Sequence, residues 1–304
     1  MRFALALLLT AAALPAATYY LTVTGLGGEP DYAQHFAMWA KDIEKALKPA
    51  PDAKVETLVN ATREQVRGAL DRIAKESKLQ DALVVMLIGH GSFDGYEYKI
   101  NLPGPDLTAS ELAALLDRIP ATRQLVVNMT SASGGSLEFL RKPGRVVIAA
   151  TKSGTEKDAT VFPRYWVEAL SDPAADSDKN EVVSALEAFR FADKKTVAYF
   201  EQENRLATEH AVLEDTGKGD GVRAPSPANG EGMLAGQFPL LRIGATAAAA
   251  KDPAKLRLLA KKEELEQQID KLKYDKAEMP PDEYKKQLGA LLLQLAQTQE
   301  AIDK

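Results

Sequence analysis

Two motifs place residues capable of acid–base chemistry at the ends of apolar segments. Residues 83–88 are apolar throughout and run into the motif Gly89-His90-Gly91. Residues 126–129 lead into a turn of small residues that begins at Ser131. An imidazole and a hydroxyl can exchange a proton during a reaction. If the two segments are parallel strands of one sheet, both side chains lie beyond the carboxyl ends of the strands, at the same rim.

The two motifs resemble those of legumain- and caspase-type (clan CD) cysteine peptidases. Residues 89–92, Gly-His-Gly-Ser, are similar to their histidine motif, and residues 131–134, Ser-Ala-Ser-Gly, are similar to their Cys-x-Ser-Gly turn. The likeness covers residues 19–170 and extends to an exported bacterial caspase-like group with serine in place of the cysteine. It implies a dyad of His90 and Ser131, with the amides of Gly91 and Ser131 as oxyanion donors.

Serine at the nucleophile position changes the expected chemistry, and the chain contains no cysteine. A serine hydroxyl is far less acidic than a thiol, so serine enzymes add a third group that orients the histidine. Asp94, Asp106 and Asn128 are candidates for that group. We expect a catalytically inactive homologue that binds a peptide or protein ligand. The alternatives are a serine-type hydrolase that uses the His90–Ser131 dyad, or a histidine and a serine turn that share no site.

Residues 176–187 match a 12-residue EF-hand calcium loop at positions 1, 3, 5, 9 and 12. Calcium would be bound by side-chain oxygens, one backbone carbonyl and a bidentate carboxylate. In chain order, these expected ligands are Asp176, Asp178, Asn180, Val182 (carbonyl), Ser184 and Glu187. Glu181 stands where such loops carry glycine, which predicts weakened binding. The alternative is an acidic cap on the helix that begins at Ser184.

The alternation of strand and helix patterns predicts an α/β fold with a doubly wound, mainly parallel sheet flanked by helices. The resemblance implies that this fold is caspase-like. Strands are expected at 19–24, 54–59, 81–89, 124–129 and 145–150, with a peripheral strand at 96–102. Helices are expected at 32–47, 62–74, 108–119, 161–170 and 184–203, and residues 213–236 are expected to form a surface loop.

The C-terminal residues 251–304 predict a helical hairpin separate from the α/β domain of residues 18–250. Helical patterns at 254–273 and 282–303 are broken by Met-Pro-Pro-Asp at 279–282. Apolar residues recur in each helix at coiled-coil spacing, so the two helices should pack antiparallel. The hairpin either drives self-association or buries its seam against the domain.

Residues 1–17 have the features of a signal peptide, which predicts an exported protein, periplasmic or secreted. One arginine precedes an apolar stretch that ends in small residues, and the alternative is an uncleaved anchor. No later stretch is long and apolar enough to cross a membrane. The 304-residue chain has a net charge of −5 and no basic block, which argues against nucleic-acid binding.

The remaining candidate features are expected to be structural. His35 falls in the first helix and His210 follows the long helix at 184–203. The glycines at 25, 27 and 28 do not complete a dinucleotide-binding pattern, because residue 30 is proline. They predict a tight turn or one wall of a cleft, and no organic cofactor is expected.

Overall fold

The central sheet has six strands in the order β10-β8-β7-β3-β1-β2. The computed structural model describes residues 16–226 and 230–304. Neighbouring strands are parallel except at one edge, where β10 runs antiparallel to β8. The strands are β1 (Thr18–Thr24), β2 (Ala53–Leu58), β3 (Ala82–Ile88), β7 (Arg123–Asn128), β8 (Arg145–Ala149) and β10 (Val212–Glu214). The predicted doubly wound, mainly parallel sheet is confirmed.

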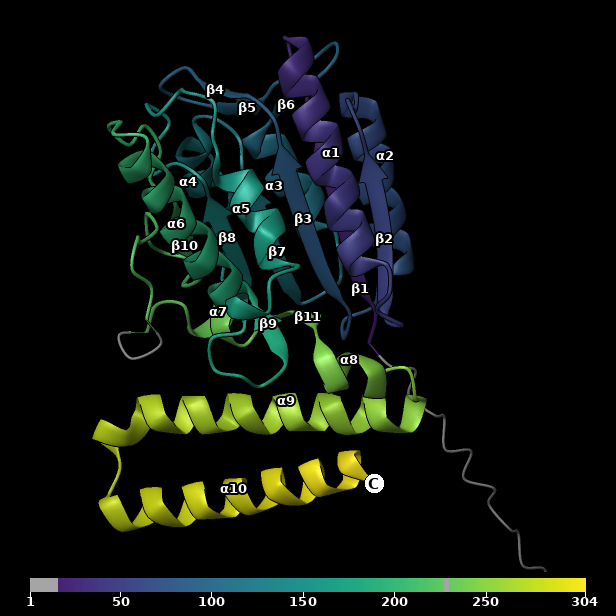
Figure 1. Cartoon of the computed structure of the whole chain (residues 1–304), viewed down its shortest axis with the longest axis vertical. Coiled ribbons are helices and arrows are strands. Elements are labelled where there is room, and N and C mark those ends of the chain that lie inside the picture. The colour runs from purple at the N-terminus through teal and green to yellow at the C-terminus, as the bar shows by residue number, and fades with distance from the viewer. Residues whose placement is uncertain (1–15, 227–229) are drawn as a thin grey trace, which may run out of the picture.

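Helices cover both faces of this sheet (Figure 1). One face packs against α1 (Pro30–Leu47), α5 (Phe162–Ala169) and α6 (Ala185–Gln202). The other packs against α2 (Arg63–Glu76), α3 (Ala109–Asp117) and the short α4 (Leu137–Leu140). Local sequence fixes where two of them begin, because Thr62 and Ser184 each form a reciprocal capping box with the residue three places later.

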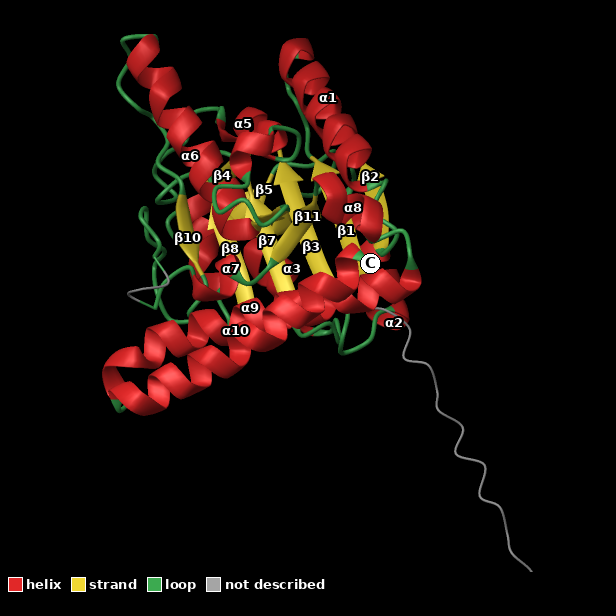
Figure 2. Ribbon diagram, turned by 60° about the horizontal axis from the view of Figure 1, so that its bottom comes forward, coloured by secondary structure: helices red, strands yellow, loops and turns green. Residues whose placement is uncertain are grey.

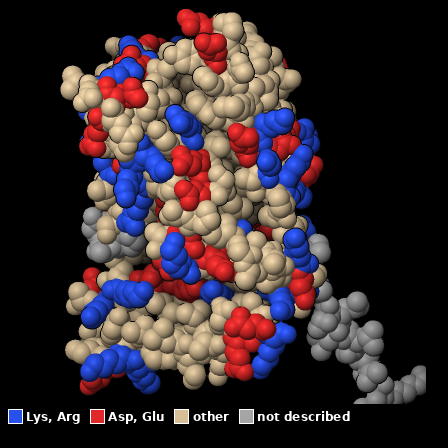
Figure 3. All heavy atoms as spheres, viewed as in Figure 1, with Lys and Arg blue, Asp and Glu red and all other residues tan. Residues whose placement is uncertain are grey.

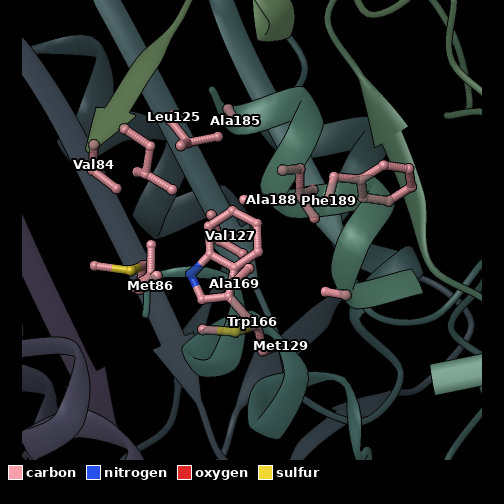
Figure 4. Packing of buried hydrophobic residues seen from close by; sticks show 14 of the residues in the cluster. Val84, Met86, Leu125, Val127, Met129, Trp166, Ala169, Ala185, Ala188 and Phe189 are labelled. Carbon is pink, nitrogen blue, oxygen red and sulfur yellow. The ribbon is translucent and has the colours of Figure 1, made fainter. Parts of the chain in front are cut away.

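The central strand β3 is buried on both faces, as its unbroken apolar sequence predicts. Each of its seven residues has an exposed fraction of 3% or less. Side chains of a strand alternate between faces, so Met86 packs beside Trp166 of α5 while Val85 packs in the cluster on the other face. Figure 4 shows Met86 of β3 and Val127 of β7 beside Trp166. This packing fixes where β3 and β7 end, and so it positions His90 and Ser131.

A small sheet sits directly beyond the end of β3. It contains β4 (Gly91–Phe93), β5 (Tyr98–Ile100) and β6 (Leu107–Thr108), paired antiparallel. The peripheral strand expected at 96–102 corresponds to β5. His90 therefore lies at the junction between the central sheet and this smaller one.

The prediction of a surface loop at 213–236 was wrong at both ends of that range. Its first residues belong to β10, where Leu213 and Glu214 are buried, and its last form α7 (Met233–Gly236). The carboxylate of Asp215 accepts hydrogen bonds from the amides of Gly232 (2.9 Å) and Ala235 (3.0 Å). A three-residue strand is too short to show an alternating sequence pattern. Pairing with β8 determines that these residues form a strand.

The C-terminal helices lie across the amino ends of the strands (Figures 1 and 2). The hairpin consists of α9 (Pro253–Tyr274) and α10 (Pro281–Asp303), and α8 (Gly244–Ala249) precedes it. Arg242, at the end of β11 (Pro239–Arg242), pairs with Glu263 of α9 (2.8 Å) and with Asp52 (3.0 Å). No helix in the described part of the chain is long and apolar enough to span a membrane. The predicted signal peptide lies outside the described residues except for its last two.

Candidate functional site

His90 follows β3 at the carboxyl rim of the sheet, and its imidazole packs against aromatic residues of α1. The ring centroid lies 4.9 Å from that of Tyr32 and 5.3 Å from that of Phe36, both in edge-on arrangements. Its backbone carbonyl accepts a hydrogen bond from the amide of Asn101 (3.0 Å), which fixes the main chain here. The imidazole is half-buried and makes no side-chain hydrogen bond to any described residue.

Ser131 follows β7 at the same rim, but its hydroxyl is enclosed. The residue is 2% exposed, and its Oγ has no hydrogen-bond partner within residues 16–226 and 230–304. The next residue, Ala132, adopts a left-handed conformation (φ 55°) and starts the 3-10 turn Ser133–Ser136. The amide of Ala132 donates to the carbonyl of Glu156 (2.7 Å). The turn is thus held in place while the serine hydroxyl stays unpaired.

Gly91 brings the two motifs into contact through the backbone. A Cβ built on Gly91 would lie 2.5 Å from the carbonyl oxygen of Ser131 and 2.6 Å from the hydroxyl of Tyr98. Only a glycine allows this approach. The two motifs predicted to share a rim therefore do meet there, whereas the imidazole of His90 and the hydroxyl of Ser131 are not hydrogen-bonded to each other.

A buried polar network occupies the space behind Ser131. The hydroxyls of Tyr98 and Thr130 hydrogen-bond each other, and both reach the Oδ1 of Asn128 (3.3 and 2.8 Å). Asn128 Nδ2 donates to Ser136 Oγ (3.0 Å). Burial raises the pKa of Tyr98 to about 12, so the phenol stays neutral. The side-chain amide of Asn128 makes its hydrogen bonds within this network and makes none to His90.

The two carboxylates proposed as a third group also have other partners. Asp94 accepts from the amides of Tyr96 (3.0 Å) and Glu97 (2.9 Å). These bonds, with that to Lys99, lower the pKa of Asp94 to about 2. Asp106 accepts from the amide of Leu102 (3.0 Å). None of the three candidates bonds the histidine.

Glu156 and His210 form an imidazole–carboxylate pair that the sequence did not reveal. His210 Nδ1 lies 2.5 Å from Glu156 Oε1, and the amide of His210 donates to Glu156 Oε2 (3.1 Å). Next to it, the carboxylate of Glu209 accepts from the amides of Val161 (2.7 Å) and Phe162 (3.4 Å) at the start of α5. Because Glu156 also holds Ala132, this pair supports the serine turn. No local pattern marks it, since its two members are 54 positions apart.

A cavity of about 730 Å³ opens at the rim between α1, the segment before α5 and the end of α6. Tyr32 lines it and also contacts His90. Thr160 lines it too, and its hydroxyl donates to the carbonyl of Met129 (2.7 Å), two residues before Ser131. Its size suits a peptide or small-molecule ligand. The cavity is therefore adjacent to both motifs.

The predicted calcium loop brings its acidic residues together. Ligand oxygens of Asp176, Asp178 and Glu187 lie within 4.8 Å of one another. Burial and the neighbouring carboxylates of Glu187 and Asp176 raise the pKa of Asp178. Such crowding favours a cation, and carboxylate oxygens are among the ligands that calcium prefers. The residues present thus fit a calcium ion.

Hydrogen bonds hold the loop in this shape. Glu187 accepts from the amide of Ser177 (2.9 Å) and from the hydroxyl of Ser184 (2.9 Å). Asn180 Oδ1 accepts from the amide of Val182 (2.7 Å). Ser184 caps α6, and the carboxylate of Glu187 completes the capping box. These capping bonds use the same carboxylate that a cation would use.

Glu181 keeps the turn that glycine would normally allow. Its φ is 65°, a left-handed conformation that is costly for a residue with a side chain. Its carboxylate accepts from the amide (2.7 Å) and hydroxyl (2.9 Å) of Thr246 in α8. The next three residues form β9 (Val182–Ser184), which pairs with β11. The departure from glycine is thus compensated by a contact with α8.

The calcium loop and the His90–Ser131 rim lie at opposite ends of the sheet. The loop shares a cavity of about 300 Å³ with α9, lined by Asp178, Glu187, Glu263, Glu266 and Asp270 among others. Figure 3 shows acidic side chains gathered in the groove between the domain and the hairpin. A cation in the loop would stabilise the packing of β9 and α6 and would not contact the rim.

Comparison with known proteins finds similarity in fold only. No family model matches the chain, and no curated protein matches it in sequence. The Drosophila initiator caspase Dronc is 14% identical with a TM-score of 0.44, covering 66% of this chain and 80% of its own. A Geobacter sulfurreducens protein is 13% identical with a TM-score of 0.48, covering 76% of this chain and 100% of its own. The α/β fold of this chain is assigned from the order and register of its strands.

Proposed function

We propose that this protein is a catalytically inactive, peptidase-like protein that binds a peptide or protein ligand at the carboxyl rim of its sheet. The observation that supports this is the enclosed hydroxyl of Ser131, which has no hydrogen-bond partner among the described residues. A serine becomes nucleophilic only when a base accepts its proton. The imidazole of His90 packs on Tyr32 and Phe36 instead. The adjacent cavity supplies the space for a ligand.

Two measurements on the purified protein test this proposal. An array of immobilised peptides should retain the wild-type protein and Ser131→Ala equally, because the hydroxyl does not face the ligand. A fluorogenic peptide library should give no hydrolysis above buffer with either protein. Turnover that Ser131→Ala abolishes supports the alternative, a serine hydrolase with His90 as base. Absence of binding to any peptide contradicts the proposed function.

We further propose that the loop at 176–187 binds calcium as a structural ion. The crowding of Asp176, Asp178 and Glu187 favours it, and the position of the loop beside β9 and β11 makes stabilisation its expected effect. Asn180, Val182 and Ser184 would complete the oxygen ligands. The ion would supply charge neutralisation and rigidity at this end of the molecule.

Export and self-association complete the proposal. Residues 1–17 would direct the chain to the periplasm or the exterior. The hairpin would join copies of the chain through α10, of whose residues only Ile302 is buried. Leu292 and Leu293 on this helix are 48% and 61% exposed. These leucines would supply apolar area to such a contact.

A further inference from the structure

The polar bonds that attach the helical hairpin to the α/β domain lie near the base of the hairpin. Arg242 joins Asp52 of the domain to Glu263 of α9, at 3.0 and 2.8 Å. One turn further along α9, the side chain of Gln267 donates to the carbonyl of Gln237 (3.1 Å). We call residues 268–291 the far part of the hairpin. No described residue of the far part forms a hydrogen bond or ion pair with the domain.

Apolar packing is divided in the same way. One small buried cluster joins the residue after α8 to both helices of the hairpin, near its base. Its members are Ala250, Leu256, Leu259 and Ile302. The two clusters that pack the central sheet contain no residue of α9 or α10. In Figure 2 the turn between these helices extends beyond the domain. The far part of the hairpin is therefore less firmly attached than the base.

The groove between the loop at 176–187 and α9 is lined by many more acidic than basic side chains. The charged residues around this cavity are Asp178, Glu187, Glu263, Glu266, Asp270 and Lys273. Ion pairs neutralise Glu263 and Asp270. The nearest cation to Glu266 is Lys262, whose Nζ lies 4.0 Å away, and Glu266 accepts no hydrogen bond from a described residue. Carboxylates thus face each other across the groove.

Glu266 is the carboxylate of α9 that is influenced by the loop. Burial raises the pKa of Glu266 to about 7, and Asp178 and the acidic neighbours on α9 raise it further, whereas Lys262 opposes the shift. Asp178 belongs to the cluster of three loop carboxylates whose oxygens lie within 4.8 Å, and Glu266 lies outside that cluster. Repulsion between exposed charges decays over about 8 Å at physiological salt. The loop and α9 therefore repel each other when both are ionised.

We propose that a divalent cation in the loop at 176–187 draws the far part of the hairpin against the domain. The cation would cancel most of the charge on the three loop carboxylates, and the repulsion of Glu266 and Asp270 would fall with it. Calcium keeps waters among its oxygen ligands, so Glu266 can bind the ion through a water. This inference rests on the proposed calcium site and gives that site a regulatory role.

Spin labels can report the position of the hairpin, because the chain has no cysteine of its own. Lys194→Cys on α6 and Ala277→Cys at the turn of the hairpin are both exposed and take one nitroxide each. Pulsed double electron–electron resonance on the full chain compares calcium chloride with EGTA. The measurement is made at pH 8, so that Glu266 is mostly ionised. With calcium, the distribution of distances between the labels should be narrower and centred at a shorter distance.

Variants separate the acidic side chains of α9 from general charge. Glu266→Gln with Asp270→Asn should give the narrow distribution even in EGTA, and calcium should not change it further. Calorimetry should show that calcium binds about fivefold more weakly to this variant, because two coupled events affect each other equally. The control, Glu283→Gln with Glu300→Gln, removes two exposed carboxylates of α10 that do not line the groove. It should respond to calcium as the wild type does. Thermal melting verifies that both variants fold.

Two results would overturn the inference and leave the calcium site in place. One is an unchanged distance distribution in a protein that binds calcium by calorimetry. The other is a response to calcium that persists in Glu266→Gln with Asp270→Asn. A third result, no heat of calcium binding to the wild-type protein, would refute the proposed calcium site, and the inference would fall with it.

Discussion

At the scale of single residues, Gly91 is the position where the two motifs touch. An added methyl group would lie 2.5 Å from the carbonyl of Ser131. We expect Gly91→Ala to lower the free energy of unfolding by about 2 kcal/mol, because the backbone must shift to relieve the overlap. Gly68→Ala is the matched control, since this glycine is exposed in α2 with nothing within 4 Å. The control should stabilise the protein by about 0.5–1 kcal/mol. Equal effects in urea denaturation contradict the close contact.

Glu209 predicts a specific pH dependence of stability. Burial raises the pKa of Glu209 from 4.5 to about 8. The hydrogen bonds that it accepts from two backbone amides lower the pKa by a smaller amount. The folded state therefore holds this proton more tightly than the unfolded state. Its contribution to stability is present below pH 4.5 and is lost as the pH rises to about 8, by about 1.4 kcal/mol per pH unit.

Denaturation at several pH values checks this dependence. Glu209→Gln keeps the shape and removes the titration, so its free energy of unfolding should fall less between pH 5 and pH 8 than that of the wild type. Identical pH profiles would show that Glu209 does not titrate as its burial implies.

At the scale of elements, the loop at 176–187 supports β9 and the start of α6, and we expect it to bind calcium. Calcium should bind to the wild-type protein with measurable heat and raise its melting temperature, because the ion binds the folded state preferentially. Asp178→Asn removes one charged ligand and should weaken binding at least tenfold. Asp172→Asn, which removes the carboxylate that caps the preceding 3-10 turn, is the control and should leave calcium affinity unchanged. A wild-type protein that gives neither heat nor a rise in melting temperature refutes the site.

The elements differ in how far sequence alone could predict them. β3 follows from an unbroken apolar run and β7 from the shorter apolar run at 125–127, and helices such as α2 follow from a cap and a periodic face. β10 and α7 could not be predicted, since they depend on pairing with β8 and on the distant carboxylate of Asp215. In the candidate site, the proximity of the two motifs followed from strand topology. The orientation of His90 did not, because Tyr32 and Phe36 on α1 determine it. The partnership of Glu156 with His210 is equally a product of tertiary packing.

At the scale of the whole molecule, we expect the helical hairpin to be separable from the core. The two clusters that pack the sheet contain no residue beyond Ile243. A chain that ends at Ala250 should therefore stay folded, with a lower melting temperature from the loss of contacts to α9. Light scattering after size-exclusion chromatography should show the full chain as an oligomer and the shortened chain as a monomer. A monomeric full chain contradicts assembly through the hairpin, and Leu292→Lys with Leu293→Lys tests the same face without truncation.

The two proposed sites lie at opposite ends of the sheet. His90, Ser131 and the rim cavity lie at the carboxyl end of the sheet, and the calcium loop and hairpin lie at the amino end. If both proposals hold, removal of calcium should change the melting temperature more than the affinity for peptides. The central claim about the rim is that Ser131 is not an activated nucleophile.

Labelling with a fluorophosphonate tests that claim most directly. The reagent reacts with a serine whose proton an adjacent base accepts. After incubation with the folded protein, digestion and mass spectrometry would locate any adduct. We predict no adduct on Ser131, since its Oγ is buried and unpaired in the part of the chain that the structure describes. An adduct on Ser131 that disappears in His90→Ala would contradict the account and establish a working dyad.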